Sequence, residues 1–333
     1  MAKPSSTLRR PRTERVSLYQ EITTKIIAQL EAGCVPWVQP WSGGAGTAAV
    51  GMPRNAVTSR SYSGINVMLL WAAGFENGYA AQRWLTFRQA LSLGGCVRKG
   101  ERGTTVVYAD RFTPEEERER AIREGDAAQQ ISFLKRFTVF NVAQCDGLPE
   151  ALTVPPPPPR EDLILPRFRA LMEASGATIR MGGTMAFYRP GDDVIVLPPP
   201  ESFHEPVNFH RTAAHELGHW TGHPSRLNRE MKARRGGACY TREELVAEIT
   251  AAFVCASLGV VPTVRHADYI GAWLEVLRED ERAIVRAASA ASKAADCLLA
   301  FDRYQDETWL GGAGEGGRSD EELADGSHLS EAA

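Results

Sequence analysis

One stretch limits the folds open to this chain more than any other: five consecutive prolines in VPPPPPR, residues 154–160. Proline has no amide N–H and a fixed φ, so this run can form neither a helix nor an inner strand of a sheet. It favours a stiff polyproline II spacer. We therefore expect a linker at residues 151–160 between two domains, which 333 residues are enough to build. A proline-rich surface loop within one domain is the alternative.

Charge is distributed unevenly along the chain. The net charge is −3, but residues 1–112 carry 14 Lys and Arg against 6 Asp and Glu, a local net charge of +8 that leaves −11 for the rest. A basic region on an acidic chain predicts a polyanionic partner for that region. Six cysteines are scattered without a Cys-x-x-Cys pair, which favours free thiols in a reducing cytoplasm. No apolar run approaches the roughly 20 residues of a membrane helix, so we expect a cytoplasmic protein with no membrane partner.

The first domain, residues 14–150, is predicted to have an α+β fold and to follow a disordered basic N-terminus at 1–13. Apolar residues at helical spacing, ended by glycines, predict helices in three stretches, 14–33, 62–74 and 86–95. Residues 103–112 and 131–144 are rich in β-branched and aromatic side chains, which predicts a pair of antiparallel strands. The charged residues 113–130 are interpreted as a solvated excursion between these strands.

The second domain, residues 161–308, is predicted to be mostly helical with a small antiparallel sheet. Residues 185–198, MAFYRPGDDVIVLP, alternate around a Pro-Gly-Asp-Asp turn, which is typical of a hairpin. A long helix is expected at 241–259. The glycine-rich, acidic tail at 309–333 has almost no large apolar side chains, so we expect it to be disordered.

A candidate metal site lies in TAAHELGHWTGH, residues 212–223. Residues four apart share one face of a helix, so His215 and His219 project side by side and can bind one cation. Glu216 is placed to act as a general base on a water at that cation. This His-Glu-x-x-His arrangement is typical of zinc peptidases. Zn²⁺ is the expected ion, with Mn²⁺ or another divalent metal as alternatives. The other interpretation is a pair of buried histidines with satisfied hydrogen bonds.

A catalytic zinc site needs a third protein ligand. His223 is a weak candidate, because the helix is expected to end near Gly222 and three histidines at this spacing would spread over about 12 Å. Glu248 is the first choice, since a carboxylate that faces an apolar helix surface is costly unless it is paired or bound to metal. Glu244 is the second choice, although it could instead close a capping box with Thr241. The glutamate that is not a ligand would accept a hydrogen bond from a histidine N–H.

The first domain also interleaves aromatic and basic residues, a pattern typical of proteins that hold single-stranded DNA without reading its sequence. The candidate DNA-binding residues are Trp37, Trp41, Arg54, Arg60, Tyr62, Trp84, Arg88, Arg98, Lys99 and Arg102. The alternative is that the tryptophans belong to the core and the cations form a solvated surface.

Five blocks of this sequence resemble the ArdC-like antirestriction proteins of conjugative plasmids. In order they are LYQEITTKIIAQLEAGCVPWVQPW, SYSGINVMLLW, WLTFRQALSLGGCVRKGERGTTVVY, HELGHWTGHPSRLNRE and YTREELVAEITAAFVCASLG. The resemblance runs from about residue 14 to about 305, and its N-terminal domain is also similar to one in TraC-type plasmid primases.

The resemblance implies a first domain that binds single-stranded DNA and a second that is a zincin-like metallopeptidase of polyvalent mobile-element proteins. His215 and His219 would be ligands, Glu216 the base, and a glutamate of EELVAE the third ligand. The protein would protect incoming DNA from host restriction, and its peptidase would act on a host protein that the sequence does not identify. Two alternatives stay open: a DNA-shielding protein with a non-catalytic metal site, and a metallopeptidase that cleaves a repressor.

Overall fold

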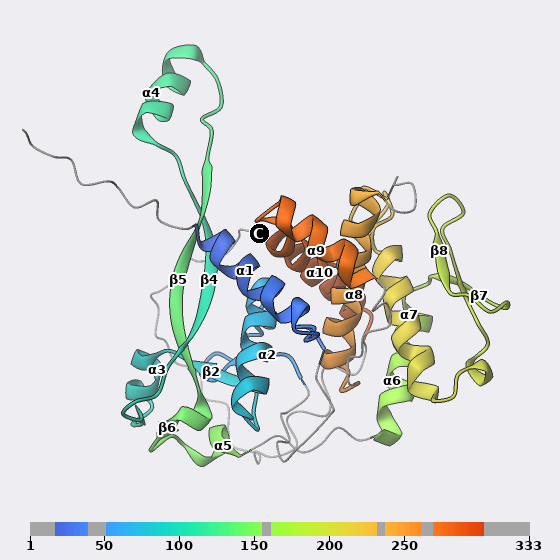
Figure 1. Ribbon diagram of the computed structural model, residues 1–333, viewed down its shortest axis with the longest axis horizontal. Coiled ribbons are helices and arrows are strands. Elements are labelled where there is room, and N and C mark those ends of the chain that lie inside the picture. The colour runs from blue at the N-terminus through green and yellow to red at the C-terminus, as the bar shows by residue number, and fades with distance from the viewer. Residues whose placement is uncertain (1–16, 39–50, 155–160, 232–236, 261–268, 303–333) are drawn as a thin grey trace, which may run out of the picture.

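The computed structural model describes residues 17–38, 51–154, 161–231, 237–260 and 269–302. The expected N-terminal tail, the five prolines of the linker and the acidic C-terminal tail lie outside these ranges. Trp41, one of the candidate DNA-binding residues, does so as well. The described residues form helices and small sheets, which agrees with the predicted α+β class (Figure 1).

The N-terminal part, residues 17–154, combines helices with a four-stranded sheet. Helix α1 (Leu18–Glu31) begins at the N-cap Ser17, and helices α2 (Ile65–Asn77) and α3 (Phe87–Ser92) follow where the sequence predicts them. The strand order is β1 (Arg54–Asn55), β2 (Arg83–Leu85), β5 (Ile131–Asn141) and β4 (Thr104–Phe112). The first pair is parallel and the other two are antiparallel. A separate short pair joins β3 (Cys96–Val97) to β6 (Cys145–Asp146), and helix α5 (Glu150–Thr153) ends this part.

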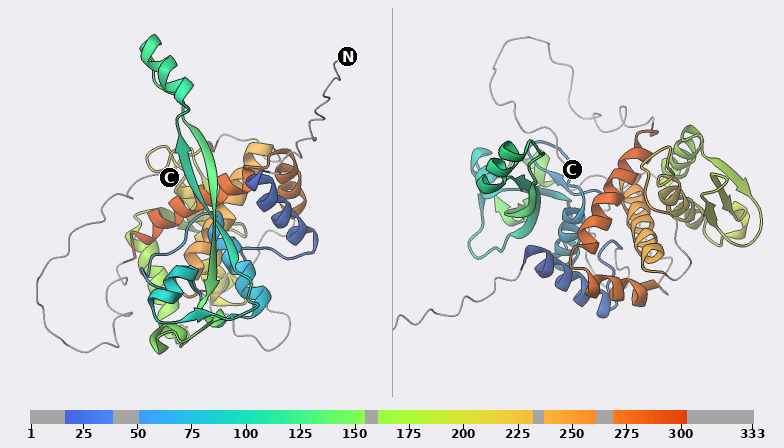
Figure 2. Two further views of the ribbon diagram at one scale, coloured as in Figure 1. Left: turned by 90° about the vertical axis from the view of Figure 1, so that its left-hand side faces the viewer. Right: turned by 90° about the horizontal axis from the view of Figure 1, so that it is seen from above.

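Strands β4 and β5 form a long ribbon whose far end stands away from the rest of the molecule (Figures 1 and 2). Their pairing runs from Thr104 opposite Val139 to Phe112 opposite Ile131, which confirms the predicted antiparallel pair. The charged excursion between them contains a helix, α4 (Glu115–Glu124). Three glutamates in its first turn favour this helix, because negative charge there complements the helix dipole.

The C-terminal part, residues 161–302, is mostly helical, as predicted. Helix α6 (Glu161–Ala174) precedes a three-stranded sheet with the order β7 (Thr178–Met181), β9 (Val194–Leu197) and β8 (Phe187–Arg189). The predicted hairpin β8–β9 is present, but β7 pairs with β9 in parallel, so the sheet is mixed rather than antiparallel. The apolar and largely buried β9 takes the centre, where it has a partner on each side.

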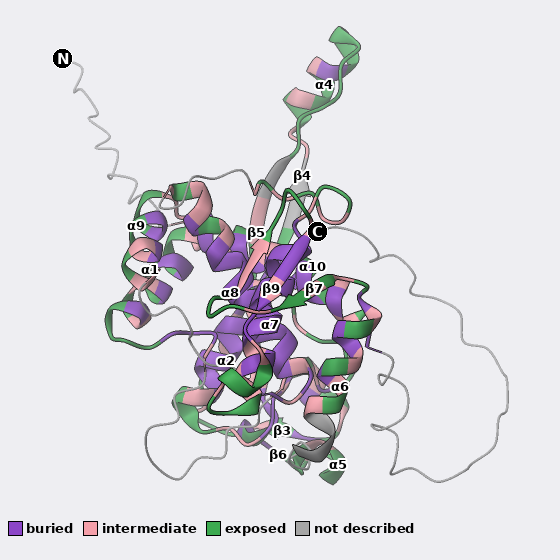
Figure 3. Cartoon of the chain, turned by 90° about the vertical axis from the view of Figure 1, so that its right-hand side faces the viewer, coloured by how far each residue is buried: buried purple, intermediate pink, exposed green. Residues whose placement is uncertain are grey.

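Among the described residues, four more helices complete the C-terminal part, and their bounds are α7 (Pro206–Trp220), α8 (Ala238–Ser257), α9 (Ile270–Glu279) and α10 (Ala283–Leu299). Helix α8 packs between α7 and α10 and carries a nearly continuous run of buried side chains (Figure 3).

One hydrophobic core joins the two parts of the chain. The ring of Trp37, which follows α1, meets Trp273 of α9 edge to face with centroids 5.5 Å apart. Trp71 of α2 meets Phe253 of α8 in the same way at 5.6 Å. The described residues on either side of the prolines therefore pack as one body, with α1 against α9 and α2 against α10.

Candidate metal centre

Close packing of α7 on α8 brings the candidate ligands together. Gly218 lies in α7 between the two histidines, where a β-carbon would be 3.2 Å from both the Cα and the carbonyl oxygen of Ala247 in α8. Because those are backbone atoms, a β-carbon here would push the two helices apart by a few tenths of an ångström, so glycine favours their close approach. The face of α7 toward α8 is almost fully buried, so its polar side chains need partners within the protein.

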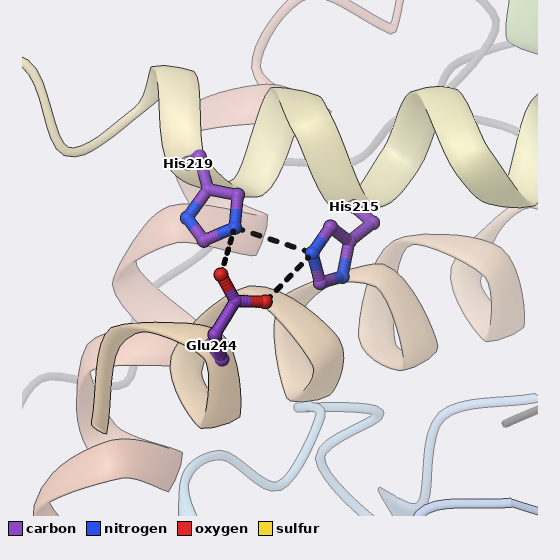
Figure 4. A group of neighbouring side chains, drawn as sticks. All are labelled: His215, His219 and Glu244. Atoms are coloured by element: carbon purple, nitrogen blue, oxygen red, sulfur yellow. Dashed lines mark hydrogen bonds and ion pairs between the residues drawn. The ribbon is translucent and has the colours of Figure 1, made fainter. Parts of the chain in front are cut away.

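Three side chains converge where the two helices meet: His215, His219 and Glu244 (Figure 4). The two Nε2 atoms are 3.2 Å apart. Oε2 of Glu244 lies 3.4 Å from Nε2 of His215, and Oε1 lies 3.6 Å from Nε2 of His219. One ligand atom from each of the three residues lies within 4.8 Å of the others. Two ligands about 2.1 Å from one tetrahedral ion are about 3.4 Å apart, so this donor set fits Zn²⁺ or an ion of similar size.

Glu248, the first choice for the third ligand, lies on the opposite side of the His215 ring from Glu244. Its Oε2 lies 3.0 Å from Nδ1 of His215, on the edge of the ring away from Nε2. Glu244, and not Glu248, faces both Nε2 atoms. The predicted N-cap at Thr241 is also wrong, since α8 begins at Ala238 with Gly237 as its N-cap. Glu244 therefore lies well inside the helix, directed at α7 rather than at the end of its own helix.

The electrostatics of the cluster favour added positive charge. Burial opposes a charged ring on His215, but its hydrogen bonds with Glu244 and Glu248 outweigh burial and raise the pKa of the imidazole to about 10. Burial is likewise outweighed at His219, where Glu243 and Glu244 raise the pKa to about 9. Burial alone would raise the pKa of Glu244, but the two histidines hold it well below its usual range. Without cations here the carboxylates would be buried and uncompensated, which is costly.

Glu216, the predicted base, is buried beside the first ligand and contributes to the raised pKa of His215. Tyr240 was not expected at this site: its hydroxyl hydrogen-bonds the hydroxyl of Tyr269 at 3.2 Å and also the carboxylate of Glu244. His223 lies beyond the end of α7, in a turn where its Nδ1 contacts Oγ of Ser225 at 2.7 Å.

Glu243 and Arg229 also contact this cluster, and they too were missed. Glu243 is visible in the sequence as part of EELVAE, but spacing along one helix does not say which neighbour it meets. Arg229 lies in the loop after α7, where the sequence has no periodic pattern that predicts contacts. Only the folded loop brings its guanidinium to within 2.7 Å of Glu243.

The candidate DNA-binding aromatic residues of the N-terminal part need correction. Trp37 and Trp84 are fully buried, so they are core residues, and their rings cannot stack on bases. Tyr62 is half-buried against the same core. The sequence could not separate core rings from surface rings, because both follow the same residue pattern. Exposed aromatic rings do occur at positions that the sequence did not single out, namely Phe87, Tyr108 and Phe137.

The candidate cations are exposed, and they are Arg54, Arg60, Arg88, Arg98, Lys99 and Arg102. The turn between Arg54 and Arg60 is joined to α3, which carries Arg88, by a 3.2 Å hydrogen bond from Asn55 to Gln89. Helix α3 also packs against β3, beside the turn that holds Lys99. The structure therefore brings several of these cations to neighbouring segments. Arg98 is partly neutralised by Glu101 at 2.8 Å.

Comparison with known proteins supports both parts of this description. Residues 16–140 match the family model of the N-terminal domain of anti-restriction factor ArdC, and residues 166–290 match that of a zincin-like metallopeptidase. The metal-free crystal structure of antirestriction ArdC protein from plasmid R388 is similar to this chain at a TM-score of 0.71 and 40% identity. The match covers 86% of this chain and 97% of that one. This chain belongs to the ArdC antirestriction family.

The Mn(II)-bound structure of the R388 ArdC protein gives a TM-score of 0.70 at 39% identity, over 87% of this chain and 99% of that chain. The uncharacterized protein y4eC of Sinorhizobium fredii (strain NBRC 101917 / NGR234) is 38% identical over 306 residues, or 89% of this chain and 95% of that protein. A DNA primase TraC of Escherichia coli is 38% identical over 303 residues, 86% of this chain. The match spans only 27% of that primase's length.

Two further features of this ArdC family member concern its cysteines and its helices. The six cysteines, which all lie in described residues, are free thiols. Among the helices that the structure describes, none combines the length and the apolar character needed to cross a membrane.

Proposed function

We propose that this ArdC family member protects the incoming DNA of a mobile element from host restriction by two linked activities. Its N-terminal part binds single-stranded DNA, and its C-terminal part is a metal-dependent peptidase that acts on a host protein. The observation that carries the second activity is the convergence of His215, His219 and Glu244 within 4.8 Å.

Zn²⁺ is the preferred ion for two imidazoles and a carboxylate, and Mn²⁺ is the alternative because R388 ArdC has a Mn(II)-bound form. A bound ion would polarise the carbonyl of a peptide and lower the pKa of a coordinated water. The chain's own contribution is to hold the ion through His215, His219 and Glu244. Glu216, which follows the first of these ligands, would accept the proton of the attacking water.

The decisive variant for catalysis is Glu216→Gln, which removes the base but keeps the size of the side chain. We expect it to bind metal and DNA like the wild type and to lose cleavage of the host target. Mass spectrometry of host proteins before and after exposure to each form would identify that target. Full protection against restriction by the Glu216→Gln variant would refute the peptidase activity.

A second candidate function is favoured by the burial of the centre. His215 is 3% exposed and Glu216 is 5% exposed, so the site could hold a structural metal ion in a protein that only shields DNA. The same variant separates the two functions, because a shielding protein would protect DNA equally well with glutamine at position 216.

The proposal for DNA binding is supported by the exposed cations and aromatic rings of the N-terminal part. Replacement of Arg60, Arg88 and Lys99 by glutamine should lower the salt dependence of single-strand affinity by about 0.7 in log–log slope for each lost phosphate contact. A salt titration in which wild-type affinity stayed constant would contradict DNA binding through these cations.

Base stacking can be tested separately on α3, where Phe87 and Leu91 are one turn apart and similarly exposed, at 50% and 53%. If Phe87 stacks on a base, Phe87→Ala should weaken single-strand binding by about 1–3 kcal/mol, whereas Leu91→Ala should change it little. Equal losses for the two variants would point to general apolar contact instead.

A further inference from the structure

The loop after α7 folds back onto its own helix and onto α8 through one arginine. The guanidinium of Arg229 donates to the carbonyl oxygen of Gly218 at 2.7 Å and to Oγ1 of Thr221 at 2.8 Å. It also donates hydrogen bonds to both carboxylate oxygens of Glu243, with Nε 3.0 Å from Oε2 and Nη2 2.7 Å from Oε1. The two side chains are only 12% and 11% exposed, so this ion pair is largely shielded from water.

Glu243 links Arg229 to the candidate metal centre. Its Oε1 lies 3.2 Å from Nδ1 of His219. An ionised carboxylate can only accept hydrogen bonds, so Nδ1 must carry the proton. In the neutral ring, which is the form that binds a metal ion, the lone pair is then on Nε2, the nitrogen that faces His215 and Glu244.

We propose that Glu243 and Arg229 are positioning residues that set the metal affinity of this site through His219. Glu243 fixes the tautomer and the orientation of the ring. Arg229 fixes Glu243 and, by holding both of its oxygens, keeps this carboxylate from becoming a ligand itself. The inference rests on the proposed metal site but concerns different residues from the three candidate ligands.

The two histidines differ in how they are held. His215 contacts Glu248, which lies in the same helix as Glu244. His219 is held through an arginine from the loop after α7, which also contacts the last turn of that helix. The position of this loop is thereby coupled to the geometry at His219, and the proposal predicts that changes in the loop alter metal binding without changing any ligand.

The test compares Glu243→Ala, Glu243→Gln and Arg229→Met with the wild type in the full-length protein. Affinity for Zn²⁺ is measured by competition with a chelator, and the coordination of Co²⁺ in its place is followed by visible absorption. We expect Glu243→Ala and Arg229→Met to weaken Zn²⁺ binding about 10–100-fold and to alter the Co²⁺ spectrum. Glu243→Gln should lose less than Glu243→Ala, because the amide oxygen still accepts from His219.

Arg226→Met is the matched control. Arg226 lies in the same loop, is 15% exposed and forms an ion pair with Asp193. Its side chain contacts neither His215 nor His219 but donates to the carbonyl oxygen of Trp220. This variant should lower thermal stability and leave both Zn²⁺ affinity and the Co²⁺ spectrum as in the wild type. If Arg229→Met does not fold, Arg229→Lys takes its place, since lysine keeps the charge but cannot grip both oxygens.

Failure of the proposed metal site and failure of the positioning role would give different results. A wild-type protein that binds no divalent metal would refute the proposed metal site. A wild-type protein that binds metal, with Glu243→Ala and the folded Arg229 variant unchanged in affinity and spectrum, would overturn the positioning role alone.

Discussion

Gly218→Ala is the sharpest test of how the metal centre is assembled. The added β-carbon would lie 3.2 Å from Cα and O of Ala247 and 3.4 Å from Cβ of Thr250. Carbon atoms in ordinary contact are about 3.5–4.0 Å apart. Because two of the three neighbours are backbone atoms, no side-chain rotation relieves the overlap, and the two helices must separate by a few tenths of an ångström.

The expected cost follows from two opposing effects. Overpacking in a core destabilises a protein by about 1–3 kcal/mol. Replacing a glycine inside a helix with alanine stabilises the helix by about 1 kcal/mol. The net loss of stability is therefore about 0–2 kcal/mol. The effect on the site is larger, because Glu244 is one turn from Ala247 and a constellation that binds metal must be held to about 0.5 Å. We expect metal affinity to fall about 10-fold or more.

The assay pairs denaturant unfolding of the metal-free protein with a chelator titration, and Gly271→Ala is the control. Gly271 is an exposed residue of α9, and no atom of the described residues lies within 4 Å of the β-carbon that alanine would add. The same substitution there should raise stability by up to about 1 kcal/mol and leave metal affinity unchanged. If Gly218→Ala behaved like Gly271→Ala in both assays, close packing of α7 on α8 would not be what positions the ligands.

Three further predictions concern other parts of the structure. Glu244→Gln should abolish metal retention on gel filtration, whereas Glu248→Gln should keep the metal with about 10–100-fold weaker affinity. Trp273→Ala should leave a cavity in the shared core, cost about 3–5 kcal/mol in calorimetry, and still give one unfolding transition. Arg226 holds the pKa of Asp193 below its usual range, so the stabilisation by this pair is present at pH 7 and is lost as the pH falls. The stability gap between wild type and Asp193→Asn should therefore close below about pH 4.

The sequence predicted most reliably what depends on the period of a single element. Two histidines four residues apart must share a face of a helix, and the structure has them with Nε2 atoms 3.2 Å apart. The sequence also predicted the ribbon of β4 and β5, because its β-branched and aromatic residues favour strands whatever surrounds them.

No local sequence pattern shows whether Glu244 or Glu248 faces the Nε2 atoms of both histidines. The two residues are one turn apart on α8, so both can face α7, and the choice is set by how α7 and α8 are aligned along their lengths. That alignment is fixed by the close approach at Gly218, which shows only in the packed pair. The sequence could not predict which aromatic rings are exposed for the same reason, since Trp37 is buried by a tryptophan from the other side of the proline run.

Helix α8 explains why the two parts of the chain share one core. It carries Glu243, Glu244 and Glu248 to the metal centre, and nearer its C-terminal end it packs Phe253 against Trp71 of α2. Helix α2 in turn packs along β4, the edge strand of the N-terminal sheet. Without the N-terminal part, the apolar surface of α8 around Phe253 would lose this partner. The placement of the three glutamates therefore depends on residues from both sides of the prolines, even though every candidate ligand comes from one side.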